Sequence, residues 1–146
     1  MLGGTGAFAA PSDEDCMACH SDPNLTKDMG NGVTRSMSLV AAVFAESIHG
    51  PIGCVSCHTD IVEIPHDPDL KPVNCGECHA EAEAYTLSLH GKALASGDKD
   101  VGGCIDCHGK HDTRASSDPL SMTYPRNLAQ TCGRCHSDAN LVKTHR

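Results

Sequence analysis

Large aromatic side chains are scarce in this chain of 146 residues, which has two Phe, two Tyr and no Trp. Such side chains normally contribute much of the buried area of a globular core. The apolar fraction of 39% looks ordinary, but it counts Ala and ten Cys. The length suits one domain or two small ones. We therefore expect the chain to have little with which to build a core of protein side chains alone.

A basic block and a long apolar run are also missing. Eleven Lys and Arg are scattered among nineteen Asp and Glu, and the formal net charge is −8. This acidic balance argues against nucleic acid and anionic membrane surfaces as partners. No apolar run approaches the roughly 20 residues that a membrane-spanning helix needs, so we expect no transmembrane segment in this chain.

Residues 1–12 are expected to lie outside the packed domain. The run Ala7-Phe8-Ala9 resembles the small-x-small cleavage site of a secretory signal, but a basic n-region and most of an apolar h-region are missing. A signal-peptide remnant and a flexible leader both remain open. The packed domain is expected over residues 13–146, as one continuous array without an internal boundary.

Cysteine and histidine are in excess, with ten of each. The pattern Cys-x-x-Cys-His occurs five times and uses every cysteine, and we number these pentads in chain order. Such a pentad attaches a c-type haem through two thioethers, and its histidine binds the iron. Disulfides do not explain the histidines, and zinc sites do not require His after every second Cys. Five haems c are therefore predicted, attached in turn to Cys16 and Cys19, Cys54 and Cys57, Cys75 and Cys78, Cys104 and Cys107, and Cys132 and Cys135.

The histidines divide into two equal groups, which predicts two histidine ligands for each iron. The pentads supply His20, His58, His79, His108 and His136. The spare histidines are His49, His66, His90, His111 and His145. The prediction is weakest at His145, because chain ends fray. If His145 does not ligate, one iron is open, is completed by another chain, or takes a methionine, for which Met29, Met37 and Met122 are the candidates.

His111 follows the fourth pentad by only three residues, which span at most about 10 Å. That span is too short to pass around a flat macrocycle, so we expect His111 to serve a different haem from His108. His49 and His90 each lie in a repeated Ser-x-His-Gly context. The pairing of the other spare histidines is left open.

A few short helices in a mostly irregular chain are predicted, with little or no β structure. Apolar residues at helical spacing indicate a helix over 37–48, ended by Gly50 in a left-handed conformation. Further helices are expected over 80–89, with Gly91 just beyond, and over 126–131 after Pro125. Turn-like residues occupy 29–32, among other segments.

The pentads and the Ser-x-His-Gly units resemble those of multihaem c-type cytochromes, over about residues 16–145. The resemblance implies one domain wrapped around a chain of five haems, in the periplasm or outside the cell. It implies electron transfer to redox partner proteins or extracellular acceptors, and it includes relatives that polymerise into filaments or share a histidine across subunits. Other relatives are haem modules of larger respiratory complexes.

Catalytic residues are not predicted, because irons with two histidine ligands leave no position for a substrate. The alternative is a multihaem reductase with one open iron. Related nitrite reductases replace the pentad histidine of the catalytic haem with lysine, and no Cys-x-x-Cys-Lys occurs in this chain.

Overall fold

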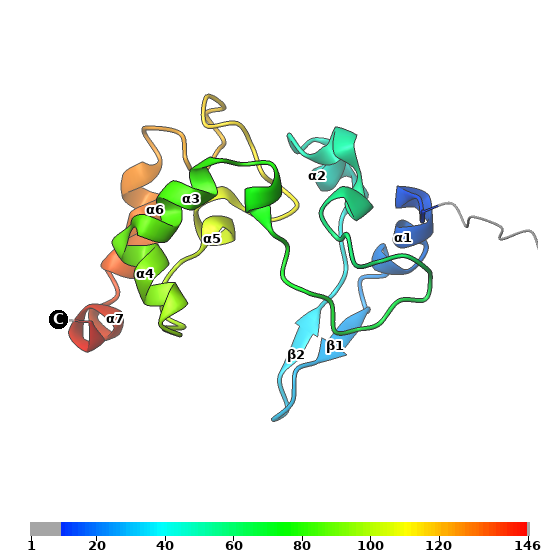
Figure 1. Cartoon of the computed structure of the whole chain (residues 1–146), viewed down its shortest axis with the longest axis horizontal. Helices are drawn as coiled ribbons and strands as arrows, with labels where there is room; N and C mark the ends of the chain where they lie inside the picture. Colours follow the sequence, from blue (N-terminus) through cyan, green and yellow to red (C-terminus); the bar gives the residue numbers. More distant parts are fainter. Residues whose placement is uncertain (1–9, 146) are drawn as a thin grey trace, which may run out of the picture.

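The computed structural model describes residues 10–145, so the expected leader lies mostly outside the described residues. Short helices follow one another along the chain, with one small sheet among them (Figure 1). The α-helices are α1 (Asp13–His20), α2 (Ala41–Ala45), α3 (Glu81–Leu87), α4 (Leu89–Ala95), α5 (Cys104–His108), α6 (Leu128–His136) and α7 (Ala139–Thr144). The 3-10 helices are η1 (Gly50–Ile52), η2 (Cys54–Ser56) and η3 (Cys75–Glu77), and the strands are β1 (Thr26–Asp28) and β2 (Thr34–Ser36). The predicted class, mostly irregular with short helices and little β structure, is confirmed.

The small sheet is an antiparallel hairpin in which Lys27 lies opposite Arg35. No strand was expected here, because the strand residues are polar and do not alternate with apolar ones. The turn at residues 29–32 was expected, and Asn31 adopts a positive φ of 53° within it. Hence turn chemistry marked the hairpin where hydrophobic pattern did not.

The expected helices are shorter or differently placed than their sequence patterns indicated. The apolar pattern over 37–48 yields only α2, and Gly50 begins η1 instead of ending a helix in a left-handed conformation. The segment 80–89 is split, because the Ser88 side chain accepts the Gly91 amide at 3.0 Å and caps a new helix, α4. The third helix begins later than Pro125 predicted and runs through the fifth pentad as α6.

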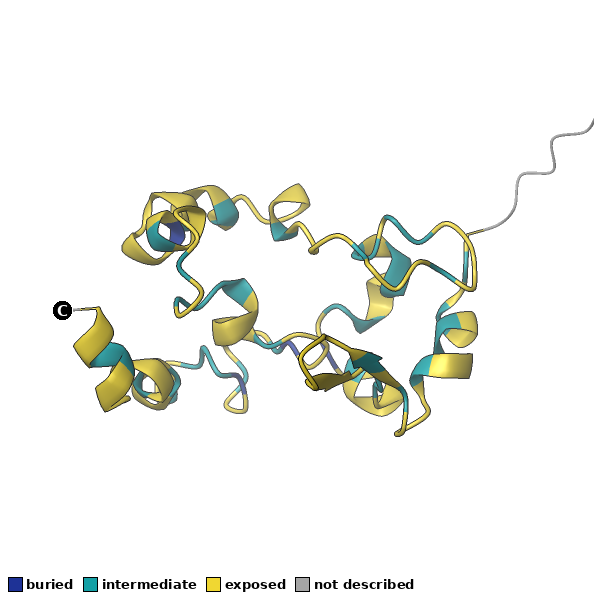
Figure 2. Cartoon of the chain, turned by 90° about the horizontal axis from the view of Figure 1, so that it is seen from below, coloured by how far each residue is buried: buried dark blue, intermediate teal, exposed yellow. Residues whose placement is uncertain are grey.

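An apolar core is missing from the described part of the chain. Between residues 10 and 145 no hydrophobic side chain is buried, and the buried positions are few and scattered (Figure 2). The chain exposes 11274 Å², whereas a folded monomer of its mass would expose about 7,100 Å². Large apolar side chains such as Leu89 and Val62 are 86% and 73% exposed. The fold is thus a thin layer of polypeptide with apolar surface to cover.

Candidate haem sites

Each pentad forms a single helical turn. The first pentad forms the last turn of α1, and the second and third pentads begin with η2 and η3. The fourth pentad is α5, and the fifth forms the last turn of α6. Residues at i, i+3 and i+4 share one face of a helix, so both thiols and the following imidazole face the same side. In the second pentad the His58 amide donates to the Cys54 carbonyl at 3.0 Å, which closes the turn.

The ten cysteines are all free thiols. Burial, with Asp13 and then Cys16 nearby, raises the pKa of the Cys54 thiol to about 12. Burial likewise raises the pKa of Cys75 and of Cys107. These surroundings favour the neutral form of the three thiols.

Cysteines of successive pentads lie close together. The Cys16 thiol is near enough to Cys54 to contribute to its raised pKa, and Cys104 acts in the same way on Cys75. The thiol of Cys132 contributes similarly to the raised pKa of Cys107. These neighbours join the first pentad to the second, the third to the fourth, and the fourth to the fifth.

The Arg134 guanidinium adds a direct tie within this series. Arg134 belongs to the fifth pentad, and its Nη2 donates to the backbone carbonyl of Asp106 in the fourth. Cys57 of the second pentad also contributes to the raised pKa of Cys75 in the third. The five pentads therefore follow one another in space in their chain order.

Four spare histidines lie opposite pentad histidines, although the members of each pair are far apart in the chain. The ring centroids are separated by 6.1 Å for His20 and His66, 5.8 Å for His49 and His79, 6.2 Å for His58 and His111, and 5.8 Å for His90 and His136. Each pair joins one pentad histidine to one spare histidine. As the short span after His108 predicts, His111 lies opposite His58 and not opposite His108.

The separation within these pairs fits an iron between the rings. A ligating imidazole nitrogen lies about 2 Å from a transition metal, and the ring centroid lies about 1 Å further out. Two imidazoles on opposite sides of one iron therefore have centroids about 6 Å apart. The four measured separations, from 5.8 to 6.2 Å, match this value.

The first pair is also in the tautomer that iron requires. The Nδ1 of His20 lies 2.7 Å from the Met37 carbonyl oxygen, and the Nδ1 of His66 lies 2.8 Å from the Asp67 carbonyl oxygen. A carbonyl only accepts, so each Nδ1 carries the proton and donates it. Both Nε2 atoms are then left with a free lone pair, as in the usual arrangement of metal-binding histidines.

The pair of His58 and His111 is kept neutral by its surroundings. Loss of hydration beside neighbouring atoms lowers the pKa of His58, and the same cause, with His58 next in effect, lowers the pKa of His111. A neutral imidazole is the form that binds a metal. The donor set, the spacing and the exposed apolar surface therefore all fit a haem.

Close backbone approach explains the glycine of Ser-x-His-Gly. A Cβ atom on Gly50 would lie 2.6 Å from the Phe44 carbonyl oxygen, and one on Gly91 would lie 2.1 Å from that of Tyr85. Each glycine thus lets the turn that carries His49 or His90 pack against the preceding helix.

The fourth pentad is the exception. In the part of the chain that the structure describes, the His108 ring pairs with no other histidine ring, and His145 does not approach a pentad histidine. His145 lies instead between the carboxylates of Asp98 and Asp100. The tenth histidine, expected as an axial ligand, is therefore not brought to a pentad in this structure.

Asp13 is a residue of the site that sequence reasoning missed. Its Oδ1 accepts the backbone amide of Cys54 at 2.8 Å and so ties α1 to the second pentad. The only local signal was Ser12, which caps α1 and marked the start of that helix. The long-range contact itself left no pattern in the sequence.

Comparison with known proteins finds one informative similarity. No helix within residues 10–145 is long and apolar enough to cross a membrane. No family model and no solved structure matches the chain. The chain is 24% identical over 169 aligned positions to the multiheme cytochrome MtrA of Shewanella baltica (strain OS185), an alignment that covers 90% of this chain. It covers 47% of that protein, so the chain spans about half the length of this relative. The similarity supports a relationship of this chain to multihaem c-type cytochromes and a role in electron transfer.

Proposed function

We propose that this chain binds five c-type haems covalently and transfers electrons along them in the order of its pentads. The observation that carries the proposal is the set of four histidine pairs, each with ring centroids 5.8 to 6.2 Å apart. Each pair joins a histidine beside two free thiols to a distant histidine, which is the donor set of a haem c with two axial imidazoles.

The chain's own residues would hold the haems close together. The thiols of successive pentads are neighbours, and His111 reaches from the fourth pentad to His58 of the second. Each haem would supply one-electron exchange between ferric and ferrous iron. At the four paired sites, two imidazoles would keep the coordination nearly unchanged in both oxidation states, which suits rapid electron transfer.

The haems would also complete the core. Apolar residues such as Leu89 and Val62 are largely exposed in the described chain and would pack against porphyrin faces. We expect the chain without haem to lack a cooperative fold, because burial of its own side chains cannot offset the entropy cost of folding.

Redox proteins or extracellular acceptors are the partners that this function requires. The proposed thioether attachment favours a location in the periplasm or outside the cell. The acidic net charge of −8 favours partners with a basic docking face. A filament of copies of this chain is one assembly that the family resemblance suggests. Negative-stain microscopy of the purified holoprotein separates filaments from single particles.

Intact-mass measurement tests the proposal directly. The chain, expressed with a cytochrome c maturation system, should exceed its polypeptide mass of 15.3 kDa by five haems. The double variant Cys75→Ala with Cys78→Ala should lose one haem, and Ser56→Ala, inside a pentad but without a thiol, should lose none. A holoprotein with fewer haems, or one that dithionite does not reduce, would exclude a five-haem electron carrier.

A further inference from the structure

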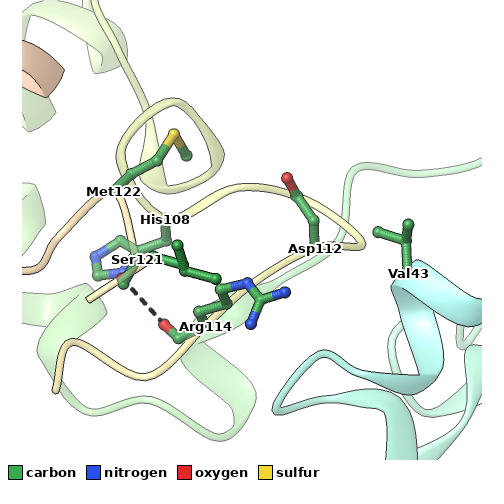
Figure 3. Close-up of a pocket in the computed structure, with 7 residues that line it drawn as sticks. Val43, His108, Asp112, Arg114, Ser121 and Met122 are labelled. Carbon is green, nitrogen blue, oxygen red and sulfur yellow. Dashed lines mark hydrogen bonds between the residues drawn. The ribbon is translucent and has the colours of Figure 1, made fainter. Parts of the chain in front are cut away.

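His108 has surroundings unlike those of the other pentad histidines. Among residues 10–145 no second histidine lies opposite it, whereas each of the other four faces one at about 6 Å. It lines a hollow of about 270 Å³, shown in Figure 3. The other lining residues are Val43, Asp112, Arg114, Leu120, Ser121 and Met122.

His145 is the one histidine left to complete the fourth iron, and it is held elsewhere. Its Nδ1 lies 3.4 Å from Oδ2 of Asp98, and its Nε2 lies 3.3 Å from Oδ2 of Asp100. Both ring nitrogens therefore face carboxylates. Ligation of an iron by His145 would require at least one of these contacts to be given up.

Met122 lines the same hollow as His108, and its side chain packs against the segment that carries His108. Its terminal methyl lies 3.6 Å from the position that a Cβ on Gly109 would take, and Gly109 directly follows His108. In Figure 3 the thioether points away from the His108 ring. The contact holds the sulfur beside the first axial ligand and not opposite it.

We propose that the iron of the fourth haem keeps an exchangeable second axial position that takes a small neutral ligand of the carbon monoxide class. The proposal rests on the proposed attachment of a haem at Cys104 and Cys107. The iron gains a bond to the ligand carbon, no electron is transferred, and any weakly held solvent molecule is displaced.

The charges near His108 bear on the ligand class. Arg114 could attract an anion, but its Nη1 lies 3.0 Å from Asp118 and its Nη2 lies 3.6 Å from Glu46. Asp112 adds a further carboxylate to the lining. The single positive side chain of this lining is thus outnumbered by carboxylates. The net negative charge around His108 disfavours an anion such as nitrite near this haem and leaves a neutral diatomic molecule as the expected ligand.

Carbon monoxide titration of the dithionite-reduced holoprotein tests the proposal. Haem content is first fixed by intact mass, so a failure of haem attachment is recognised separately from a failure of this inference. We expect one carbon monoxide per chain, with four haems remaining low-spin. His145→Ala should leave this stoichiometry and the visible spectrum unchanged. His66→Ala, or His90→Ala if the first variant is unstable, should raise the stoichiometry to two.

A fully loaded holoprotein that binds no carbon monoxide overturns the proposal. If Met122→Ala then binds one equivalent, methionine is the ligand; if dilution exposes the position, another copy of the chain supplies it. A rise from one to two equivalents in His145→Ala also overturns the proposal, because it would make His145 an axial ligand. None of these results would remove the proposed electron transfer.

Discussion

The imidazole rings of His20 and His66 lie parallel within 1°, with centroids 6.1 Å apart. Each ring is oriented by its own Nδ1 contact to a backbone carbonyl, of Met37 for one and of Asp67 for the other. The orientation is therefore set by the backbone and should persist when an iron lies between the two Nε2 atoms. The rings of His49 and His79, in contrast, are inclined by 64°.

Electron paramagnetic resonance should distinguish these two haems in the oxidised protein. Parallel axial imidazoles give low-spin ferric haem a rhombic signal, and strongly inclined ones give a signal with a large maximum g value. We expect His66→Ala to abolish the rhombic signal of the first haem and to add one high-spin haem to those of the parent, while the large-g signal remains. Asp67→Ala is the matched control, because it keeps the carbonyl that orients His66. Loss of the large-g signal in His66→Ala would contradict the pairing.

Gly91→Ala should destabilise the holoprotein because a Cβ there would overlap the Tyr85 carbonyl oxygen at 2.1 Å. Overpacking of this kind costs about 1–3 kcal/mol. His90 would move with the displaced turn, so the signal of the fifth haem should broaden. Guanidinium unfolding measures the stability change. Gly103→Ala, whose nearest contact is at 3.8 Å, should stay within about 0.5 kcal/mol of the parent. Equal stability of the two variants would refute the close-approach explanation.

The local geometry of the proposed attachment sites was predictable from the sequence, because it depends on local spacing. The pentads place both thiols and the imidazole on one helical turn without help from the rest of the fold. The spare histidines were countable, but their partners were not. His49 precedes the second pentad and pairs with His79 further along the chain, whereas His66 follows the second pentad and pairs with His20 earlier in the chain. Nothing local distinguishes those two directions.

Helix bounds were harder to predict because the usual signals assume a protein core. The apolar residues over 37–48 suggested one continuous helix, yet Ile48 is 49% exposed in the structure and α2 has only five residues. Apolar side chains that pack against a porphyrin face, as proposed for this chain, need not follow the spacing that packing against another helix requires. Gly50 was misread for a related reason, since close packing and not a positive φ requires glycine there.

Asp13→Ala should weaken the junction between the first two haem sites. The variant leaves the half-buried amide of Cys54 without the carboxylate that accepts it at 2.8 Å. Hydrogen bonds to charged groups contribute about 1.5–3 kcal/mol, and we expect a loss in this range. Glu14→Ala, one residue further along α1, is the control for the loss of an acidic side chain near the helix start. Matching unfolding midpoints for the two variants would exclude a stabilising contribution from the hydrogen bond between the Cys54 amide and Asp13.

The loop beside His108 should respond to acid through Asp118. The Leu120 amide and then the Arg114 guanidinium stabilise the Asp118 carboxylate, which lowers its pKa below the usual value. A carboxyl group with a lowered folded-state pKa stabilises the fold above its unfolded pKa of about 3.9, and this contribution is lost as pH falls through the folded value. Asp118→Asn should therefore be less stable than the parent at pH 7, and the difference should shrink as the pH falls below about 4. Guanidinium unfolding across this range measures the stability difference.

Glu46→Gln is the control, because Glu46 also reaches Arg114 but is 71% exposed, so its effect should be small at every pH. A difference for Asp118→Asn that stays constant down to pH 3 would show that the charge of Asp118 does not hold this loop.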